Sequence, residues 1–370
     1  MKLSKKNILF IFSILISIVC TWLFIRNIEW GLLKSALLDA NYWFIIPTII
    51  LTLLVYVVRA IRWRGLLSHI KLISVLNLLS VTCIGFMANN VLPARVGEVL
   101  RPFILTKKEN IKFSTSFATV IMERIFDMLG LILFTVVVIA LLPHPSAPQP
   151  NTLASVSANQ VGVVNESILP SLKKWTEVFA ALGVITLASL FSVVMKPDFF
   201  RQLLSKFCFF LPHTLKDRIL GMYESFVYGL KILEDKTQAG WAMALSIFIW
   251  ILGGAEIYLL GFSFHMHLPF VAACLVAVCL ALAVALPQAP GYIGVFHIAV
   301  LKSLHLFGIE TTAAQSYAIV LWAISILPST IMGFLFLWRE GIAFREVVKL
   351  EGEIIEGKLE EMEGVTREIR

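Results

Sequence analysis

Long apolar runs decide the solvent in which this chain folds. An α-helix needs ~20 apolar residues to cross the ~30 Å of hydrocarbon in a bilayer. Six runs approach or exceed that length: residues 8–25, 42–58, 114–142, 176–195, 241–262 and 316–338. The composition agrees, because only 15% of the residues are charged and the mean hydropathy is +0.86, whereas a soluble domain is about 25% charged. We therefore predict an all-α integral membrane protein.

The basic residues indicate how these spans are oriented, because Lys and Arg collect in the cytoplasmic loops of membrane proteins. Three lie at the N-terminus, four in residues 59–71, three in 107–112 and seven in 196–236, whereas the connections 26–41 and 263–269 hold two and none. This distribution predicts a multi-pass protein of the inner (cytoplasmic) membrane with both termini in the cytoplasm. The basic loops also account for the net charge of +7, so that charge indicates no nucleic-acid partner.

Two further apolar runs, about residues 72–92 and 270–286, end in polar turns that contain proline. Because the segments on both sides of the first are basic, we expect a hairpin over about 72–106 that enters and leaves from the cytoplasm. The same reasoning predicts a hairpin over about 270–307 that enters from outside. The result is six spanning helices plus two re-entrant hairpins, arranged as an inverted repeat of two halves.

The predicted organisation follows from these elements. Residues 1–142 form the first membrane repeat and 143–175 an extracytoplasmic linker. Residues 176–338 form the second repeat, which includes a cytoplasmic amphipathic segment at 196–237. The remaining residues, 339–370, form a cytoplasmic tail.

Both hairpins are expected to turn at the same Pro-x-x-x-Gly spacing, Pro93 to Gly97 in the first and Pro290 to Gly294 in the second, where Gly291 follows the proline. Non-helical backbone survives at membrane depth only where protein or a water-filled cavity satisfies its hydrogen bonds. A helix that begins after such a turn presents free N–H groups, which attract anions. Interrupted apolar segments at corresponding places in two inverted halves indicate a transporter's binding site.

Few charged residues fall outside the predicted loops, termini and tail: Arg95, Arg101, Arg124, Lys302, Glu98, Glu123, Asp127 and Glu256. A charge within the membrane costs ~3 kcal/mol or more, so such residues usually mark a polar pathway. On a helix that starts near Pro93, Arg95, Glu98 and Arg101 recur every three residues and share one face. We expect Glu256 to face the cavity, and His297, one turn after Gly294, to belong to the outer hairpin's site.

Two interpretations of these charges stay open. In the first, Glu123 and Asp127 form salt bridges with Arg95 or Arg101 that fasten the first hairpin to the next span. In the second, the arginines hold a lipid phosphate through forked hydrogen bonds, with the acidic residues as counter-charges or proton carriers.

Three motifs in order, "NNVLPARVGEVLRP", "ERIFD" and "PQAPGYIGVFH", resemble the transmembrane, flippase-like family of lysylphosphatidylglycerol synthases. That family includes the membrane half of the multiple peptide resistance factor. The resemblance covers roughly residues 5–340. It implies the site residues Asn90, Pro93, Arg95, Gly97, Glu98, Arg101, Glu123, Arg124, Asp127, Pro290, Gly291 and Gly294.

Two departures from the family pattern limit what the resemblance implies. Family members that make aminoacylated lipid carry a soluble transferase domain after the membrane part, where this chain has only about 30 polar residues, so we expect no synthase activity. The third motif commonly ends in an acidic residue, where this chain has His297.

The leading hypothesis is a lipid translocase that binds an anionic or phosphate-linked lipid between the two hairpins. The alternatives are a membrane transferase acting on a polyprenyl-phosphate sugar, and a membrane partner of a separately encoded lipid-modifying enzyme. We expect no cofactor, because the sequence has no Gly-rich nucleotide loop, Asp-x-Asp site or metal cluster. The expected partner is a membrane lipid, and assembly into a homo-oligomer stays open.

Overall fold

The computed structural model describes residues 5–26, 28–92, 95–142, 192, 195–207, 213–230, 235–285 and 289–356. These residues form helices and connecting turns, with no strand among them. Four of the described segments are helical, long and apolar enough to cross a membrane: Tyr42–Leu67 (η1, Tyr42–Phe44, and α3, Ile45–Leu67), Phe113–Leu141 (α6), Lys236–Ser263 (α10) and Thr311–Arg339 (α13). They confirm the all-α class, and these four candidate spans coincide with four of the six predicted spanning helices.

The N-terminal apolar run forms α1 (Lys5–Ile25), and α2 (Trp30–Leu38) follows it after a bend of 83°. The bent pair counts as a fifth span if it crosses the membrane as one unit. Of the predicted span 176–195, only Ser192 and Met195 are among the described residues, and the predicted linker 143–175 lies outside them.

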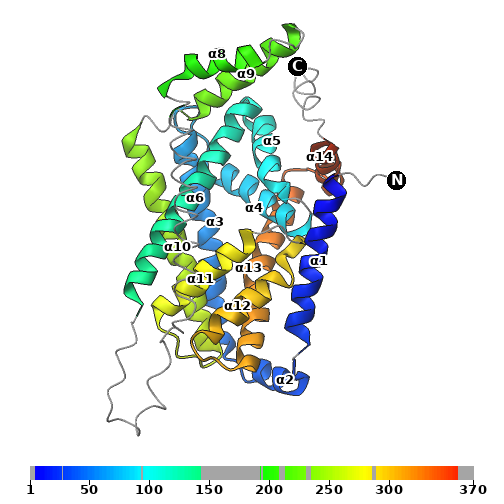
Figure 1. Cartoon of the computed structure of the whole chain (residues 1–370), viewed down its shortest axis with the longest axis vertical. Coiled ribbons are helices and arrows are strands. Elements are labelled where there is room, and N and C mark those ends of the chain that lie inside the picture. Colours follow the sequence, from blue (N-terminus) through cyan, green and yellow to red (C-terminus); the bar gives the residue numbers. More distant parts are fainter. Residues whose placement is uncertain are drawn as a thin grey trace.

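Two pairs of shorter helices occupy the stretches predicted to re-enter the membrane. The first pair is α4 (Val75–Val91) with α5 (Gly97–Glu109), and the second is α11 (Phe270–Ala285) with α12 (Val295–His305). The helices of each pair pack against each other. In Figure 1 the first pair lies in the half of the molecule nearer α8 and α9, and the second in the half nearer α2. The pairs meet where α4 contacts the turn η5 (Pro290–Tyr292) of the second pair.

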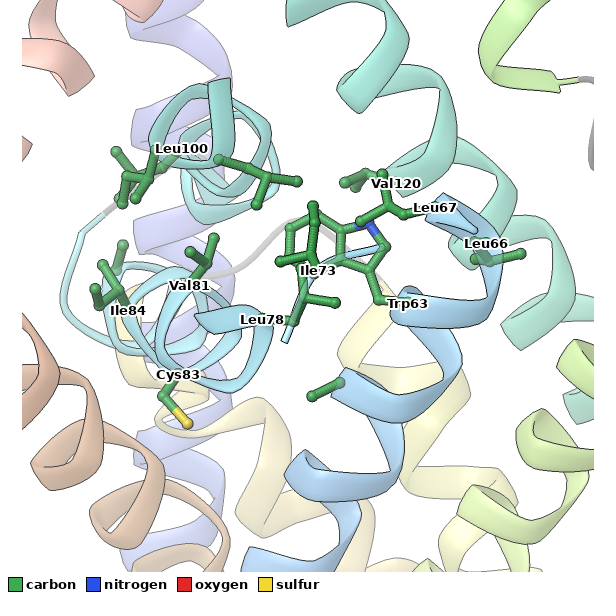
Figure 2. Packing of buried hydrophobic residues seen from close by; sticks show 14 of the residues in the cluster. Trp63, Leu66, Leu67, Ile73, Leu78, Val81, Cys83, Ile84, Leu100 and Val120 are labelled. Carbon is green, nitrogen blue, oxygen red and sulfur yellow. The ribbon is translucent and has the colours of Figure 1, made fainter. Parts of the chain in front are cut away.

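Each pair has its own apolar core. Around the first pair, α3, α4, α5 and α6 surround the buried ring of Trp63, and Figure 2 shows Ile73, Leu78 and Val120 close to this ring. The indole N–H of Trp63 donates to Thr119 Oγ1 on α6 at 3.0 Å. A second core joins α11 and α12 to α10 and α13, with Tyr317 fully buried in it.

Glycine permits the close approach of α4 and α5. A Cβ atom on Gly97 would collide with the carbonyl oxygen of Gly85 on α4 and with the side chain of Asn89. The Gly97 N–H instead donates to Asn89 Oδ1 at 2.8 Å, which satisfies one free donor at the start of α5. Gly97 is therefore needed for the close packing of α5 against α4.

At the end of the molecule where α8 and α9 lie, helices form in the predicted amphipathic segment and in the predicted tail. The predicted amphipathic segment contains α8 (Pro197–Phe207) and α9 (His213–Leu230). α9 packs against α6, and its Val227 and Leu230 are buried against protein, so this part of its apolar face covers the helix bundle. The tail begins with α14 (Phe344–Glu356).

One ion pair ties the end of α13 to α5. Lys108 Nζ lies 2.6 Å from Glu340 Oε1, which also accepts a hydrogen bond from Ser80 Oγ at 3.0 Å. Burial raises the pKa of Glu340, but the hydrogen bonds from Lys108 and Ser80 outweigh burial and leave that pKa below its usual value. The ionised carboxylate therefore holds the start of the tail against the first helix pair.

We predict that Gly97→Ala lowers the thermal unfolding temperature of the detergent-solubilised protein, because overpacking of this kind costs typically about 1–3 kcal/mol. Gly253→Ala is the matched control, since nothing lies within 4 Å of a Cβ at that position in α10 and alanine favours a helix. Equal unfolding temperatures for the two variants would contradict the close contact of α4 and α5.

Candidate functional site

A buried carboxylate on α6 connects three helices. Glu123 lies near the middle of α6 and is fully buried. Its two oxygens accept hydrogen bonds from both terminal nitrogens of Arg101 on α5, at 3.2 and 2.8 Å. Nη2 of Arg62 on α3 lies 3.1 Å away, and Nη2 of Arg124 donates from 3.3 Å. Because α3, α5 and α6 all supply a charge here, Glu123 fixes their relative positions.

One turn along α6, Asp127 extends this network. Arg59 of α3 donates to Asp127 Oδ2 at 3.1 Å, and Arg62 donates to both Asp127 Oδ1 and Ser246 Oγ of α10. Trp250 of α10 donates its indole N–H to the Asp127 carbonyl oxygen at 3.0 Å. We call the following set the charge cluster: Arg59, Arg62, Glu98, Arg101, Glu123, Arg124 and Asp127.

Two members of the charge cluster correct the sequence interpretation. Arg59 and Arg62 were expected in a cytoplasmic loop, but α3 continues to Leu67 and Arg62 is fully buried. The apolar residues that separate the two arginines, and Trp63 directly after them, continue the helix. Because Arg59 and Arg62 are three residues apart, both lie on one face of α3. This spacing is the sequence signal that could have placed the two arginines in the site, and a count of the charges in loops does not use it.

The charge cluster has a sealed end and an accessible end. The side chains of Arg62, Arg101 and Glu123 are at most 2% exposed, whereas those of Glu98 and Arg124 are each 36% exposed. Glu98 and Arg124 lie 4.0 Å apart. Arg101 also lies over the Trp63 ring, 4.3 Å from its centre, so its surroundings are those of a structural residue. Glu98 and Arg124 are the most exposed members of the cluster.

Arg95 does not share a face with Glu98 and Arg101, contrary to expectation. α5 begins at Gly97, and Arg95 lies before it in the left-handed conformation with φ of 53°. Its guanidinium donates to the carbonyl oxygen of Val284, near the end of α11. Arg95 therefore links the first helix pair to the second instead of pairing with Glu123 or Asp127. Pro93, the predicted start of the turn, lies outside the described residues.

The turns of the two pairs meet beside the accessible end. Asn90 donates to Ser329 and Thr330 of α13 at 3.1 and 3.0 Å. Its carbonyl oxygen lies against Gly291, 3.6 Å from the position of a Cβ there.

The η5 turn is shaped by positive φ angles and reaches the accessible end. These angles are 70° at Gly291, 59° at Tyr292 and 86° at Gly294. The Tyr292 hydroxyl lies within electrostatic range of Arg95, Glu98 and Arg124. Pro290 begins η5, and the Trp322 indole N–H donates to the Gly291 carbonyl oxygen at 2.7 Å.

Two predicted site residues lie apart from the charge cluster. His297 is buried on α12 between the rings of Phe24 and Trp322, with ring centres 5.0 and 5.6 Å away. Glu256 accepts a hydrogen bond from Ser325 Oγ of α13 at 3.2 Å. It lies ten residues beyond Ser246 on α10, or about 15 Å at 1.5 Å per residue.

The chemistry of the charge cluster suits an anion with several oxygens. Four guanidinium groups face three carboxylates, so one positive charge is in excess. Nε of Arg62, Arg101 and Arg124 is buried and has no hydrogen-bond partner among the described residues. Arginine donors are suited to phosphate because they bind two oxygens at once. Within the same part of the chain, no group of three or more His, Cys, Asp or Glu side chains could hold a metal ion.

The chain matches the family described as "Lysylphosphatidylglycerol synthase TM region" over residues 10–333. The chain belongs to this family. The chain is similar to two proteins named UPF0104 membrane proteins: MJ1595 of Methanocaldococcus jannaschii, 23% identical over 95% of this chain and 99% of its own length, and PH1989 of Pyrococcus horikoshii, 22% identical over 89% and 95%. The chain is also similar to "Glycosyltransferase AglD" of Haloferax volcanii, at 23% identity over 85% of this chain but only 52% of that protein.

We predict that Glu123→Gln destabilises the protein by about 3–5 kcal/mol, because breaking a buried ion pair leaves uncompensated charge behind. The measurement is thermal unfolding in detergent. The control is Glu224→Gln, which removes an exposed pair with Arg201 and should cost at most about 1 kcal/mol. A Glu123→Gln protein as stable as the control would show that the charge cluster does not hold the helices together.

Proposed function

We propose that this protein is a lipid translocase that moves an anionic phospholipid, or a polyprenyl-phosphate-linked lipid, between the two leaflets by alternating access. The observation that carries the proposal is the position of Glu98 and Arg124. They form the accessible end of a cluster with excess positive charge, where the turns of the two helix pairs meet. A phosphate head group bound there would contact both pairs at once.

The arrangement of the pairs supports alternating access. In our proposal the two pairs are re-entrant hairpins of an inverted repeat, with the α8 and α9 end in the cytoplasm. They lie in opposite halves of the molecule and meet through α4 and η5 (Figure 1). The contacts between them include Arg95 with Val284 and Asn90 with Gly291. Rocking of one repeat against the other would open the shared site to each side in turn.

The family supports a lipid as the substrate, since its description names the membrane region of an enzyme that modifies phosphatidylglycerol. In the charge cluster, Arg124 would donate hydrogen bonds to the phosphate. When no lipid is bound, Glu98 would hold the Arg124 side chain in place. The sealed arginines would add positive potential without touching the ligand.

The test is lipid movement in sealed proteoliposomes that contain only this chain. Phosphatidylglycerol, aminoacylated phosphatidylglycerol and a polyprenyl-phosphate lipid are supplied in turn, and a membrane-impermeant reagent reports leaflet exposure. Arg124→Gln should reduce the apparent affinity for the transported lipid about 10- to 100-fold, because a hydrogen bond to a charged group contributes about 1.5–3 kcal/mol.

Arg201→Gln is the matched control, since Arg201 is an exposed cation on α8 that pairs with Glu224. It should transport at the native rate. If Arg124→Gln also transported normally, the accessible end of the charge cluster would not be the lipid site. If none of the lipids moved with folded native protein, the translocase proposal would be wrong.

A second candidate function is favoured by one observation, the similarity to a protein named a glycosyltransferase, of which this chain spans about half. In that case this chain is a membrane transferase, or the membrane partner of a separately encoded enzyme that modifies or glycosylates lipid. Co-purification of such an enzyme with a native chain that moves no lipid by itself would favour this candidate.

A further inference from the structure

Glu256 differs from the other acidic residues inside the helix bundle. Glu98, Glu123 and Asp127 each have at least one arginine within 4.0 Å. Glu256 forms no ion pair among the described residues, and its partners are the hydroxyl groups of Ser325 and Thr52. Glu256 is partly buried, and a carboxylate removed from water without a cation beside it is costly to ionise, whereas the neutral acid is tolerated.

The hydrogen-bond partners of Glu256 can accommodate the neutral acid. Thr52 is buried, and its single hydroxyl hydrogen is donated to the Thr48 carbonyl oxygen at 3.1 Å. Its oxygen therefore remains an acceptor toward the carboxyl group of Glu256. A protonated carboxyl has one O–H donor as well as acceptor capacity, so it can accept from Ser325 and donate to Thr52.

The titratable groups around this carboxyl come from the helices that pack on α10. Tyr56 of α3 and Tyr317 of α13 interact electrostatically with Glu256. The Tyr317 hydroxyl donates to the Ile257 carbonyl oxygen at 2.6 Å, not to the carboxyl. The other titratable or charged side chains on the helices that pack against α10 are Tyr42 of η1, Arg59, Arg62 and Arg64 of α3, Glu123, Arg124 and Asp127 of α6, Cys274 and Cys279 of α11, and Arg339 of α13.

A line of polar side chains joins Glu256 to the proposed lipid site. Tyr56 hydrogen-bonds with Ser329, and Ser329 accepts from Asn90 beside the turns of the helix pairs. Arg59, one turn beyond Tyr56 on α3, pairs with Asp127 of the charge cluster. Because Tyr56 also interacts electrostatically with Glu256, these contacts offer a route by which a change of charge at Glu256 would reach the turns and the charge cluster.

We propose that Glu256 is a proton-binding site and that loading it with a proton is coupled to movement of the lipid. This inference rests on the proposed translocase function. A proton from water adds to a carboxylate oxygen of Glu256, and the neutral acid fits the closed packing of α3, α10 and α13. When Glu256 loses this proton to water on the other side of the membrane, its carboxylate becomes negatively charged. That charge favours the state of the protein in which the surroundings of Glu256 are hydrated. No covalent bond of the lipid forms or breaks.

The experiment uses the full chain in sealed proteoliposomes with a pH difference of one unit across the membrane, and the lipid found to move among the three named above. If one proton accompanies each lipid, the steady-state ratio of lipid between leaflets should shift by up to about tenfold. Glu256→Gln, which imitates the neutral acid, should abolish that shift. Glu310→Gln, the same substitution at an exposed residue before α13, should respond like the native protein.

Failure of this inference is distinguishable from failure of the proposed function. Native protein that moves lipid without any response to the pH difference overturns proton coupling and leaves the translocase intact, as does a Glu256→Gln variant that keeps the full response. If Glu256→Gln does not fold, Ser325→Ala serves instead, because loss of its hydrogen bond should move the pH midpoint of transport. An unchanged midpoint contradicts the proposal.

Infrared spectroscopy tests the proton site without transport. Native protein at neutral pH should show the carbonyl band of a buried, protonated carboxyl group that Glu256→Gln lacks and Glu310→Gln retains. Identical spectra for native protein and Glu256→Gln would overturn the site even if lipid transport were established.

Discussion

The ion pairs of Glu123 are the constraint on which the arrangement around the first helix pair depends. Its carboxylate is fully buried and has arginines from α3, α5 and α6 around it. Two charges taken out of water are tolerated only when their geometry is good and their remaining hydrogen bonds are made. α5 can therefore lie only where Arg101 reaches Glu123, and that position requires Gly97 to pack against Gly85.

The same ion pairs explain how one cluster can hold the fold together and still offer a binding site. At the sealed end, arginines are committed to carboxylates and to the ring of Trp63. At the accessible end, Glu98 and Arg124 stand 4.0 Å apart and a third of each side chain is exposed. In the proposed function a phosphate would displace Glu98 there, while Arg62 and Arg101 would continue to hold Glu123. Under that proposal the two interpretations of the charges, fastening and binding, apply to different members of one cluster.

The charge cluster and Glu256 have opposite electrostatic characters. The carboxylates of the cluster lie beside arginines, whereas Glu256 has hydroxyl partners and tyrosine neighbours. In the proposed mechanism the proton-binding group lies apart from the fixed charges, because Glu256 is ten residues, or about 15 Å along α10, beyond Ser246, which accepts from Arg62 of the cluster. A transporter that binds an anion with fixed positive charge needs a separate group of this kind if protons are to drive it.

The sequence by itself determined the solvent, the helical class and most elements of the site. Apolar runs predict spanning helices because a helix makes all of its own backbone hydrogen bonds. Charges inside such runs are costly and usually have a function, so the sequence indicated the following candidate site residues: Glu98, Arg101, Glu123, Arg124 and Asp127. Only the tertiary structure decided which of these charges meet. The roles of Arg59 and Arg62 depended on where α3 ends, and Arg95 turned toward Val284 because the backbone before Gly97 is left-handed. Among the described residues, no cation pairs with Glu256. The physical reason is that a pairing between helices depends on how closely their backbones approach, and residues distant in sequence, such as Gly85 and Gly97, set that approach.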